Sequence, residues 1–265
     1  LNQGHVHPKI LEAMIEQAVH SADPESWEFL LARAKLDEIH KQRRTEFKTH
    51  DQWSADSVRL QQFDHRLKDA RETKKKRQEE LSPLMAKLAQ RDITIEDKIE
   101  ALQKILERDP ENRVAMGALA YARAAADAFP EALDALRAYL KMDGRQTAMR
   151  LGLGLFEAEI LHNQGRHEEA NECLADYARR TRDPWFLALC DYLRGQQTED
   201  ELHRQAGDAP ENVLTAFTAA GFWAEGSNDK KTALRFYRDA LGSFLDNWLE
   251  YDFVRERIKR LRRPT

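Results

Sequence analysis

The stretch DAFPEALDALRAYL, residues 127–140, joins a turn to the start of a helix, and this pattern decides the fold. Asp127 is a turn former, and Pro130 suits the first positions of a helix, where an N–H has no intrahelical partner. An alanine follows five residues after Asp127, and large residues stand four and seven positions beyond it. Residues at this spacing share one helix face. The stretch therefore predicts a helix that begins at a tight turn and buries the face of Ala132.

The same pattern occurs twice more along the chain. It is found in GRHEEANECLADY, residues 165–177, and in NDKKTALRFYRDA, residues 228–240, where a turn former precedes Ala170 and Ala233 by five residues. Recurrence at a period of tens of residues indicates a repeat architecture. The three alanines are 38 and 63 residues apart, and the longer interval is close to two units. A degenerate unit with a short second helix is therefore predicted over residues 185–205.

These motifs resemble the tetratricopeptide repeat family. In that family a small residue on the first helix of each pair lets the second helix cross closely. The corresponding residues here are Ala120, Ala158 and Gly221. The alanine after the turn does the same from the second helix, and the second helix expected over residues 98–112 departs from the family by having Lys98 at that position. The resemblance covers residues 93–265 and implies a right-handed α-solenoid of helix pairs. A last helix over residues 248–263 is expected to serve as the solvating cap that a repeat array needs.

The N-terminal part, residues 1–92, has a different texture. Apolar residues recur at helical spacing over residues 24–48 and 54–80, with a turn-forming break between the two segments. Two long helices joined by a short turn predict an antiparallel hairpin of coiled character. The sequence thus predicts an all-α chain with two domains, the hairpin region at 1–92 and the repeat domain at 93–265. Self-association through the hairpin is a further expectation.

Composition limits the function classes. Only 11 of 265 residues are Gly and 8 are Pro, and no alternating apolar run predicts a strand. The formal net charge of -4 does not favour nucleic-acid binding. No apolar stretch approaches the roughly 18 residues that cross a bilayer, so a cytoplasmic protein without membrane contact is expected. Because the chain begins at Leu1 and not at methionine, we expect it to be part of a longer or processed protein.

The motifs that could carry chemistry are incomplete. No Gly-x-Ser-x-Gly or His-Glu-x-x-His sequence is present. His5 and His7 have the spacing of two zinc ligands but no third ligand nearby. The glycines of residues 152–154 lack the Lys-Ser pair of a phosphate loop and are more consistent with close helix packing. The basic run from Lys74 to Arg77 is bracketed by glutamates and predicts a solvated helix face. No catalytic residue, metal or cofactor is therefore expected.

The family resemblance implies a binding groove. First helices of tetratricopeptide pairs line a concave face that holds an extended peptide or a partner helix. By register, the candidates for that face are Tyr121, Leu155, Glu159, His162, Asn163, Phe222 and Glu225. The predicted function is therefore an adaptor or scaffold that binds another protein, with aromatic anchors and an acidic group that favours basic character in the ligand.

Three alternatives remain open on the sequence alone. The candidate groove residues can instead contact only neighbouring helices of the repeat. The chain can be the regulatory or substrate-recruiting region of an enzyme whose catalytic domain lies before Leu1. A helical nucleic-acid binder is a third possibility, which depends only on the basic run at residues 74–77.

Overall fold

A computed structural model describes residues 65, 68–69, 72–73, 75–90, 92–142, 148–246 and 248–263. The chain divides into two compact units, Leu1–Pro83 and Leu84–Thr265. In the first unit the described residues are all helical and, apart from residue 81, exposed. Most of the predicted N-terminal hairpin lies outside the described residues. The exposed helical residues 75–77 agree with the solvated face that the basic run predicts.

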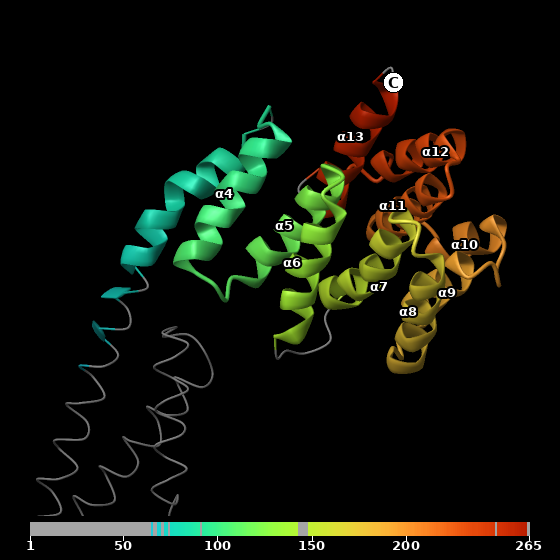
Figure 1. Cartoon of the computed structure of the whole chain (residues 1–265), viewed down its shortest axis with the longest axis horizontal. Coiled ribbons are helices and arrows are strands. Elements are labelled where there is room, and N and C mark those ends of the chain that lie inside the picture. The colour runs from blue at the N-terminus through green and yellow to red at the C-terminus, as the bar shows by residue number, and fades with distance from the viewer. Residues whose placement is uncertain are drawn as a thin grey trace, which may run out of the picture. The chain divides into compact units, whose positions relative to one another are not determined.

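The second unit is helical throughout its described residues, which contain no strand, so the all-α prediction is confirmed (Figure 1). Its helices are α4 (Ile95–Arg108), α5 (Arg113–Ala125), α6 (Phe129–Lys141), α7 (Ala148–Asn163), α8 (His167–Arg180), α9 (Pro184–Leu193), α10 (Glu199–Ala206), α11 (Pro210–Gly226), α12 (Lys230–Leu241) and α13 (Leu249–Arg262). The predicted degenerate segment corresponds to α9 and to α10, which has only 8 residues.

Four of the turns between consecutive helices share one conformation. The second residue after α5, α7, α9 and α11 has a positive φ in each case: Asp127 62°, Gly165 74°, Gly195 71° and Asn228 61°. Gly, Asn and Asp tolerate this left-handed region better than other residues do, which explains why a turn former stands at each of these four positions. The turn before α10 follows the same rule, although that segment lacks the alanine of the other motifs.

Helix starts are fixed by local polar contacts. Oxygens of Thr94, Asn112, Asp183, Thr198 and Asp229 accept hydrogen bonds from first-turn N–H groups of α4, α5, α9, α10 and α12. Such N-caps are each worth about 1 kcal/mol because they satisfy amides that have no partner within the helix. Proline stands in the first turn of α6, α9 and α11, where its fixed φ favours the helix.

The small residues of the motifs lie where helices cross. Ala132, Ala170 and Ala233 are each fully buried, and so are Ala120 and Ala158. At Gly221 an added Cβ would come within 2.7 Å of the Tyr237 ring. Small side chains are therefore required at these crossings, as the sequence pattern predicts.

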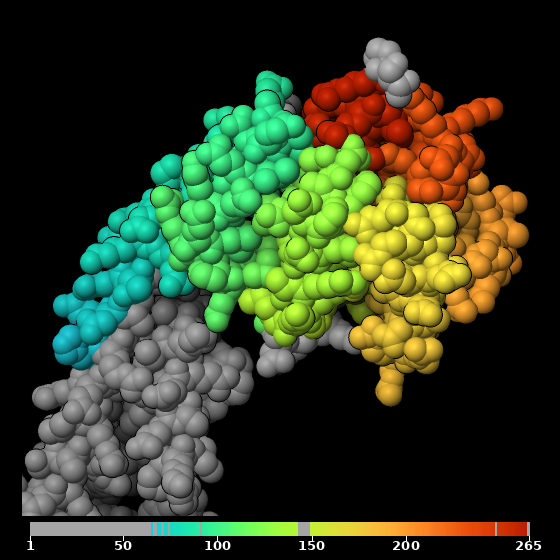
Figure 2. Space-filling model, in the orientation of Figure 1, coloured from blue at the N-terminus to red at the C-terminus, as the bar shows by residue number. Residues whose placement is uncertain are grey.

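The helices pack with α5, α7 and α11 each against the helix that follows, α6, α8 and α12 respectively. In the space-filling view, the yellow-green α6 abuts the yellow α7 (Figure 2). Helix α11 also packs directly on α7, with α9 and α10 beside this contact. Helix α13 packs on α5, α11 and α12. Two helices that are far apart along the chain, α5 and α13, are thus in direct contact.

Candidate functional site

The predicted groove residues lie at the centre of this packing. Tyr121, Leu155, Glu159, His162 and Phe222 are at most 8% exposed. Asn163 and Glu225 are only partly exposed. The prediction that these seven residues line an open concave face is therefore wrong. The physical reason is that α11 packs on α7 and α13 packs on α5, so helices cover the face that the register left open.

Four aromatic rings meet where α5, α7, α11 and α13 converge. Phe156 lies 4.3 Å from Tyr121 and 5.6 Å from Phe222, measured between ring centroids. Phe253 of α13 is 5.7 Å from Tyr121, 5.5 Å from Phe156 and 5.0 Å from Phe222. We call these four residues the aromatic centre. Sequence reasoning identified Tyr121 and Phe222 but missed the other two, since α7 has no distinct apolar face and α13 was expected to be solvated.

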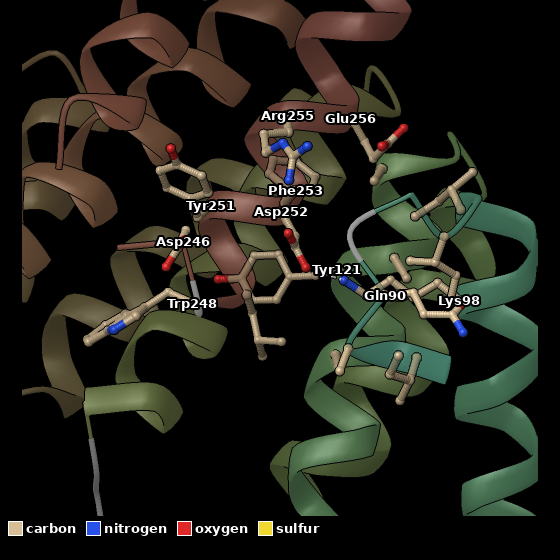
Figure 3. Close-up of a pocket in the computed structure, with 18 of the residues that line it drawn as sticks. Gln90, Lys98, Tyr121, Asp246, Trp248, Tyr251, Asp252, Phe253, Arg255 and Glu256 are labelled. Atoms are coloured by element: carbon tan, nitrogen blue, oxygen red, sulfur yellow. Dashed lines mark hydrogen bonds and ion pairs between the residues drawn. The ribbon is translucent and has the colours of Figure 1, made fainter. Parts of the chain in front are cut away.

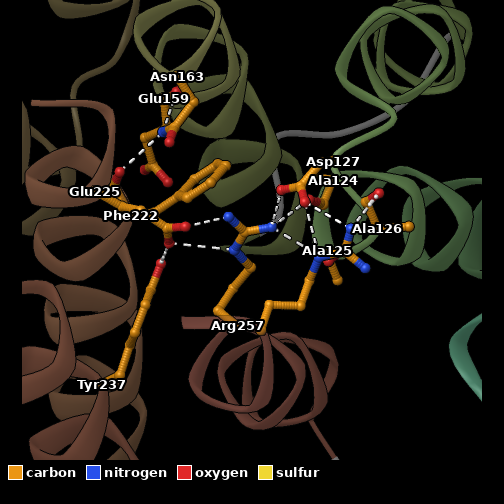
Figure 4. Close-up of polar contacts among 11 residues, drawn as sticks. Ala124, Ala125, Ala126, Asp127, Glu159, Asn163, Phe222, Glu225, Tyr237 and Arg257 are labelled. Atoms are coloured by element: carbon orange, nitrogen blue, oxygen red, sulfur yellow. Dashed lines mark hydrogen bonds and ion pairs between the residues drawn. The ribbon is translucent and has the colours of Figure 1, made fainter. Parts of the chain in front are cut away.

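A buried arginine of α13 forms the polar counterpart of the aromatic centre (Figure 4). The Arg257 guanidinium donates to both carboxylate oxygens of Glu225 and to Asp127, and it is paired with both residues. It also donates to the carbonyl oxygens of Ala124 and Ala125, each at 3.2 Å. These carbonyls belong to the last turn of α5, where the helix lacks acceptor partners of its own. Arg257 therefore ties α13 to α5 and α11.

The charge of Arg257 is stabilised despite its burial. Burial disfavours the cation, but hydrogen bonding and attraction from Glu225 outweigh burial and raise the pKa of Arg257 above its usual value. The expectation of a solvating C-terminal cap is thus wrong for this residue, which is 4% exposed. The sequence alone does not single out Arg257 as buried, because it is one of six basic residues between 255 and 263.

Two further carboxyl groups lie near the aromatic centre. The Tyr121 hydroxyl donates to Glu250 Oε1 at 3.3 Å. Burial, and then the charge of Glu250, raise the pKa of Glu159 to about 8. Burial also raises the pKa of Glu250. A carboxyl with such a pKa is mostly protonated at neutral pH, which avoids placing two negative charges side by side in a low-dielectric interior.

His162 and Asn163 join the end of α7 to the end of α11. The His162 ring stacks on Trp223 with centroids 3.9 Å apart, its Nε2 lies 2.9 Å from Ser227 Oγ, and its Nδ1 lies 2.9 Å from His167 Nδ1. Burial, then the proximity of His167, lower the pKa of His162 to about 4. Asn163 Nδ2 donates to the carbonyl oxygen of Phe222 at 2.8 Å. Both residues thus have structural contacts in place of the predicted exposure.

Beside the aromatic centre, one side of α13 borders an open pocket of about 650 Å³ (Figure 3). We call it the α5–α13 pocket. Its walls are residues of the segment 88–98, the face of α5 that contains Tyr121, and residues 246–259. In the close-up, Tyr121 lies between Trp248 on one side and Lys98 on the other. Trp248 is 39% exposed, so an indole stands at the margin of the pocket.

The charges around the α5–α13 pocket are balanced. Lys98 Nζ lies 2.6 Å from Asp252 Oδ2, and Lys259 Nζ lies 2.5 Å from Glu256 Oε1. None of the described residues that line the pocket is His, Cys, Ser or Thr. The pocket therefore presents a mixed polar and apolar surface, with aromatic rings between ion pairs.

Within the described residues, no group of three or more His, Cys, Asp or Glu side chains is placed to hold a metal ion. His5 and His7 lie outside the described residues. None of the described helices has both the length and the apolar character that a bilayer crossing requires.

Comparison of this chain with protein-family models, with curated proteins and with solved structures finds no match, so the functional argument depends on the geometry above.

Proposed function

We propose that this chain is a non-catalytic adaptor that binds a segment of another protein in the α5–α13 pocket. Its C-terminal part is, in this proposal, a right-handed α-solenoid of tetratricopeptide-like helix pairs. Support for the repeat comes from the turns at Asp127, Gly165, Gly195 and Asn228, which share one backbone conformation at one position after the preceding helix. The buried alanines five residues beyond three of these turns support it further.

The observation that carries the binding role is the make-up of the pocket. A volume of about 650 Å³ is enough for several side chains of a peptide, and the floor contains Tyr121. Tryptophan and tyrosine are the side chains that most often dominate binding energy at interfaces, and Trp248 is accessible there. The Lys98–Asp252 and Lys259–Glu256 pairs provide a polar rim around it.

The experiment is a selection of peptides from a random display library on the immobilised full chain, followed by affinity measurement on variants. Trp248→Ala should weaken the selected peptides at least tenfold, because truncating an aromatic anchor often removes about 2 kcal/mol. Phe244→Ala is the matched control, since Phe244 is 82% exposed and does not line the pocket. Peptides that bind both variants as they bind the unchanged chain would refute the pocket as the binding site.

A further inference from the structure

Helix α13 has the contacts of a ligand helix held in a groove. It buries Phe253, Val254, Arg257 and Ile258 on one face. Phe253 enters between the rings of α5, α7 and α11, and Arg257 meets two carboxylates and the end of α5. This is the mode in which an amphipathic helix binds a preformed groove, with anchors one turn apart.

The attachment of α13 is unusually polar for a core helix. More than half of its residues are charged in the sequence LEYDFVRERIKRLR. Besides Arg257, its contacts include Asp252 with Lys98, Arg260 with Asp127, and Glu250 with the Tyr121 hydroxyl. Buried ion pairs add little net stability but fix register strongly. A helix with this composition stays soluble when it is detached, unlike a helix whose face is entirely apolar.

We propose that the inner faces of α5, α7 and α11 form a helix-binding groove, that α13 is its built-in occupant, and that a partner helix with the same pattern displaces it. The required pattern is an aromatic residue followed four positions later by an arginine, as in Phe253 and Arg257, with apolar residues at the positions of Val254 and Ile258. The acidic groups at Glu225 and Asp127 select the arginine. The groove and the α5–α13 pocket share Tyr121, and α13 forms one wall of the pocket, so a partner helix that displaces α13 also removes the peptide site.

A tethered helix competes with any free one. Linkage within one chain gives α13 an effective concentration of about a millimolar, so an external helix binds the intact chain weakly. The test therefore loosens α13 without altering the groove, by Asp252→Ala and Arg260→Ala together. These residues pair with Lys98 and with Asp127 at positions that are partly exposed. Helicity and melting temperature are measured first, to establish that the loosened chain is folded.

The probe is a fluorescein-labelled peptide with the sequence of residues 248–263, and its binding is followed by fluorescence anisotropy. The peptide should bind the loosened chain at least tenfold more tightly than the unchanged chain. Peptides with Phe253→Ala or Arg257→Glu should lose at least tenfold in affinity for the loosened chain. A folded, loosened chain that binds none of the peptide would overturn the proposal, as would equal binding of the three peptides.

A bridged chain tests whether the peptide and α13 use the same groove. Lys98→Cys with Asp252→Cys places two thiols where the ion pair stood, and a short bifunctional thiol reagent then fixes α13 to α4. Cys190 is fully buried, and Cys173 is replaced by serine to keep the reaction selective. Bridging should abolish peptide binding, whereas the unbridged cysteine chain should retain it. Undiminished binding after bridging would contradict displacement.

Two results separate this inference from related ideas. One outcome of light scattering is that the loosened chain forms a stable dimer that does not bind the peptide. In that case the groove is occupied by α13 of a second copy, and the proposal is wrong. The display peptides for the α5–α13 pocket are tested on the unchanged chain and on its Trp248→Ala variant, because Lys98 and Asp252 line that pocket. If the display peptides bind equally well with and without the Trp248 side chain, only the pocket proposal is refuted. The displacement of α13 is then judged from the affinity of the labelled peptide.

Discussion

The Phe253 ring of α13 meets the Phe222 ring of α11 edge to face, with centroids 5.0 Å apart and planes inclined by 79°. Edge-to-face pairs contribute about 1 kcal/mol beyond the apolar area that they bury. Because Phe253 also contacts Tyr121 and Phe156, one side chain links the last helix to the three inner helices. The stability of the second unit should therefore be sensitive to this position.

Truncation of that ring should be costly. Phe253 is 2% exposed, so Phe253→Ala removes a buried ring and leaves a cavity, at an expected cost of about 3–5 kcal/mol in the free energy of unfolding. Urea unfolding followed by circular dichroism measures it. Phe244→Ala is the control, because an exposed ring should contribute less than about 0.5 kcal/mol. Equal midpoints for the two variants would mean that α13 is not packed as described.

Glu159 should make the protein sensitive to alkaline pH. Its folded pKa is about 8, above the usual value of 4.5. The stability that its neutral form contributes is therefore fully present below pH 4.5 and is lost as pH rises through 8. Glu159→Gln keeps the shape without the titration. The variant should be about as stable as the unchanged chain at pH 4.5 and more stable at pH 8, by roughly 4 kcal/mol. Melting curves across this range test it, and parallel curves would contradict a raised pKa.

His162 should make the protein sensitive to acidic pH. Its folded pKa is about 4 against a usual 6.5, so the unfolded chain takes up a proton first, and stability falls as pH drops from 6.5 toward 4. In an NMR titration, the ring signals of His162 should not move until pH approaches 4. Since His167 contributes to this shift, His167→Asn should raise the pKa of His162. A titration near 6.5 in the unchanged chain would show that the ring is not buried against Trp223.

Two glycines should respond in opposite ways to an added methyl group. In Gly221→Ala the new Cβ would stand 2.7 Å from the Tyr237 ring, so overpacking should cost about 1–3 kcal/mol. In Gly152→Ala the nearest atom is 3.8 Å away, on Phe186, and the better helix propensity of alanine should add about 0.5–1 kcal/mol. Thermal unfolding of both variants checks the helix register. A stabilising Gly221→Ala would refute the close crossing of α11 and α12.

The repeat alanines carry a related prediction. Ala170 is fully buried, so Ala170→Leu should overpack the start of α8 and lower the free energy of unfolding by about 1–3 kcal/mol. Ala175→Leu, on the same helix at a position that is not fully buried, is the control and should cost less. An unchanged melting temperature for Ala170→Leu would contradict the assigned register.

Local rules were sufficient for the helices and their turns. Asp127 and Asn228 mark turns because few residues accept a positive φ, and Ala170 marks a crossing because only a small side chain fits there. Because these requirements act within one turn of helix, the local residue pattern reveals both the turns and the crossings. The order of the helices and the buried alanines could be predicted for this reason.

The candidate site could not be predicted in the same way. Whether Tyr121 faces solvent depends on α13, whose Glu250 contacts it from 129 residues away along the chain. Arg257 has the same local surroundings as the exposed Arg262, and only its carboxylate partners on α11 and beyond α5 explain its burial. Periodicity identifies the face of a helix that is buried or exposed, but it does not identify the helix that covers it.

The position of α13 also bears on how the chain is made. During synthesis at about 5–20 residues per second, the aromatic surface of α5 leaves the ribosome roughly 6 to 26 seconds before Phe253 follows it. From its own synthesis until Phe253 follows, each of Tyr121, Phe156 and Phe222 lacks the helix that covers it in the finished protein. Nascent chains stalled before residue 249 should therefore be the species that chaperones bind and that aggregates, while completion of α13 ends this exposure.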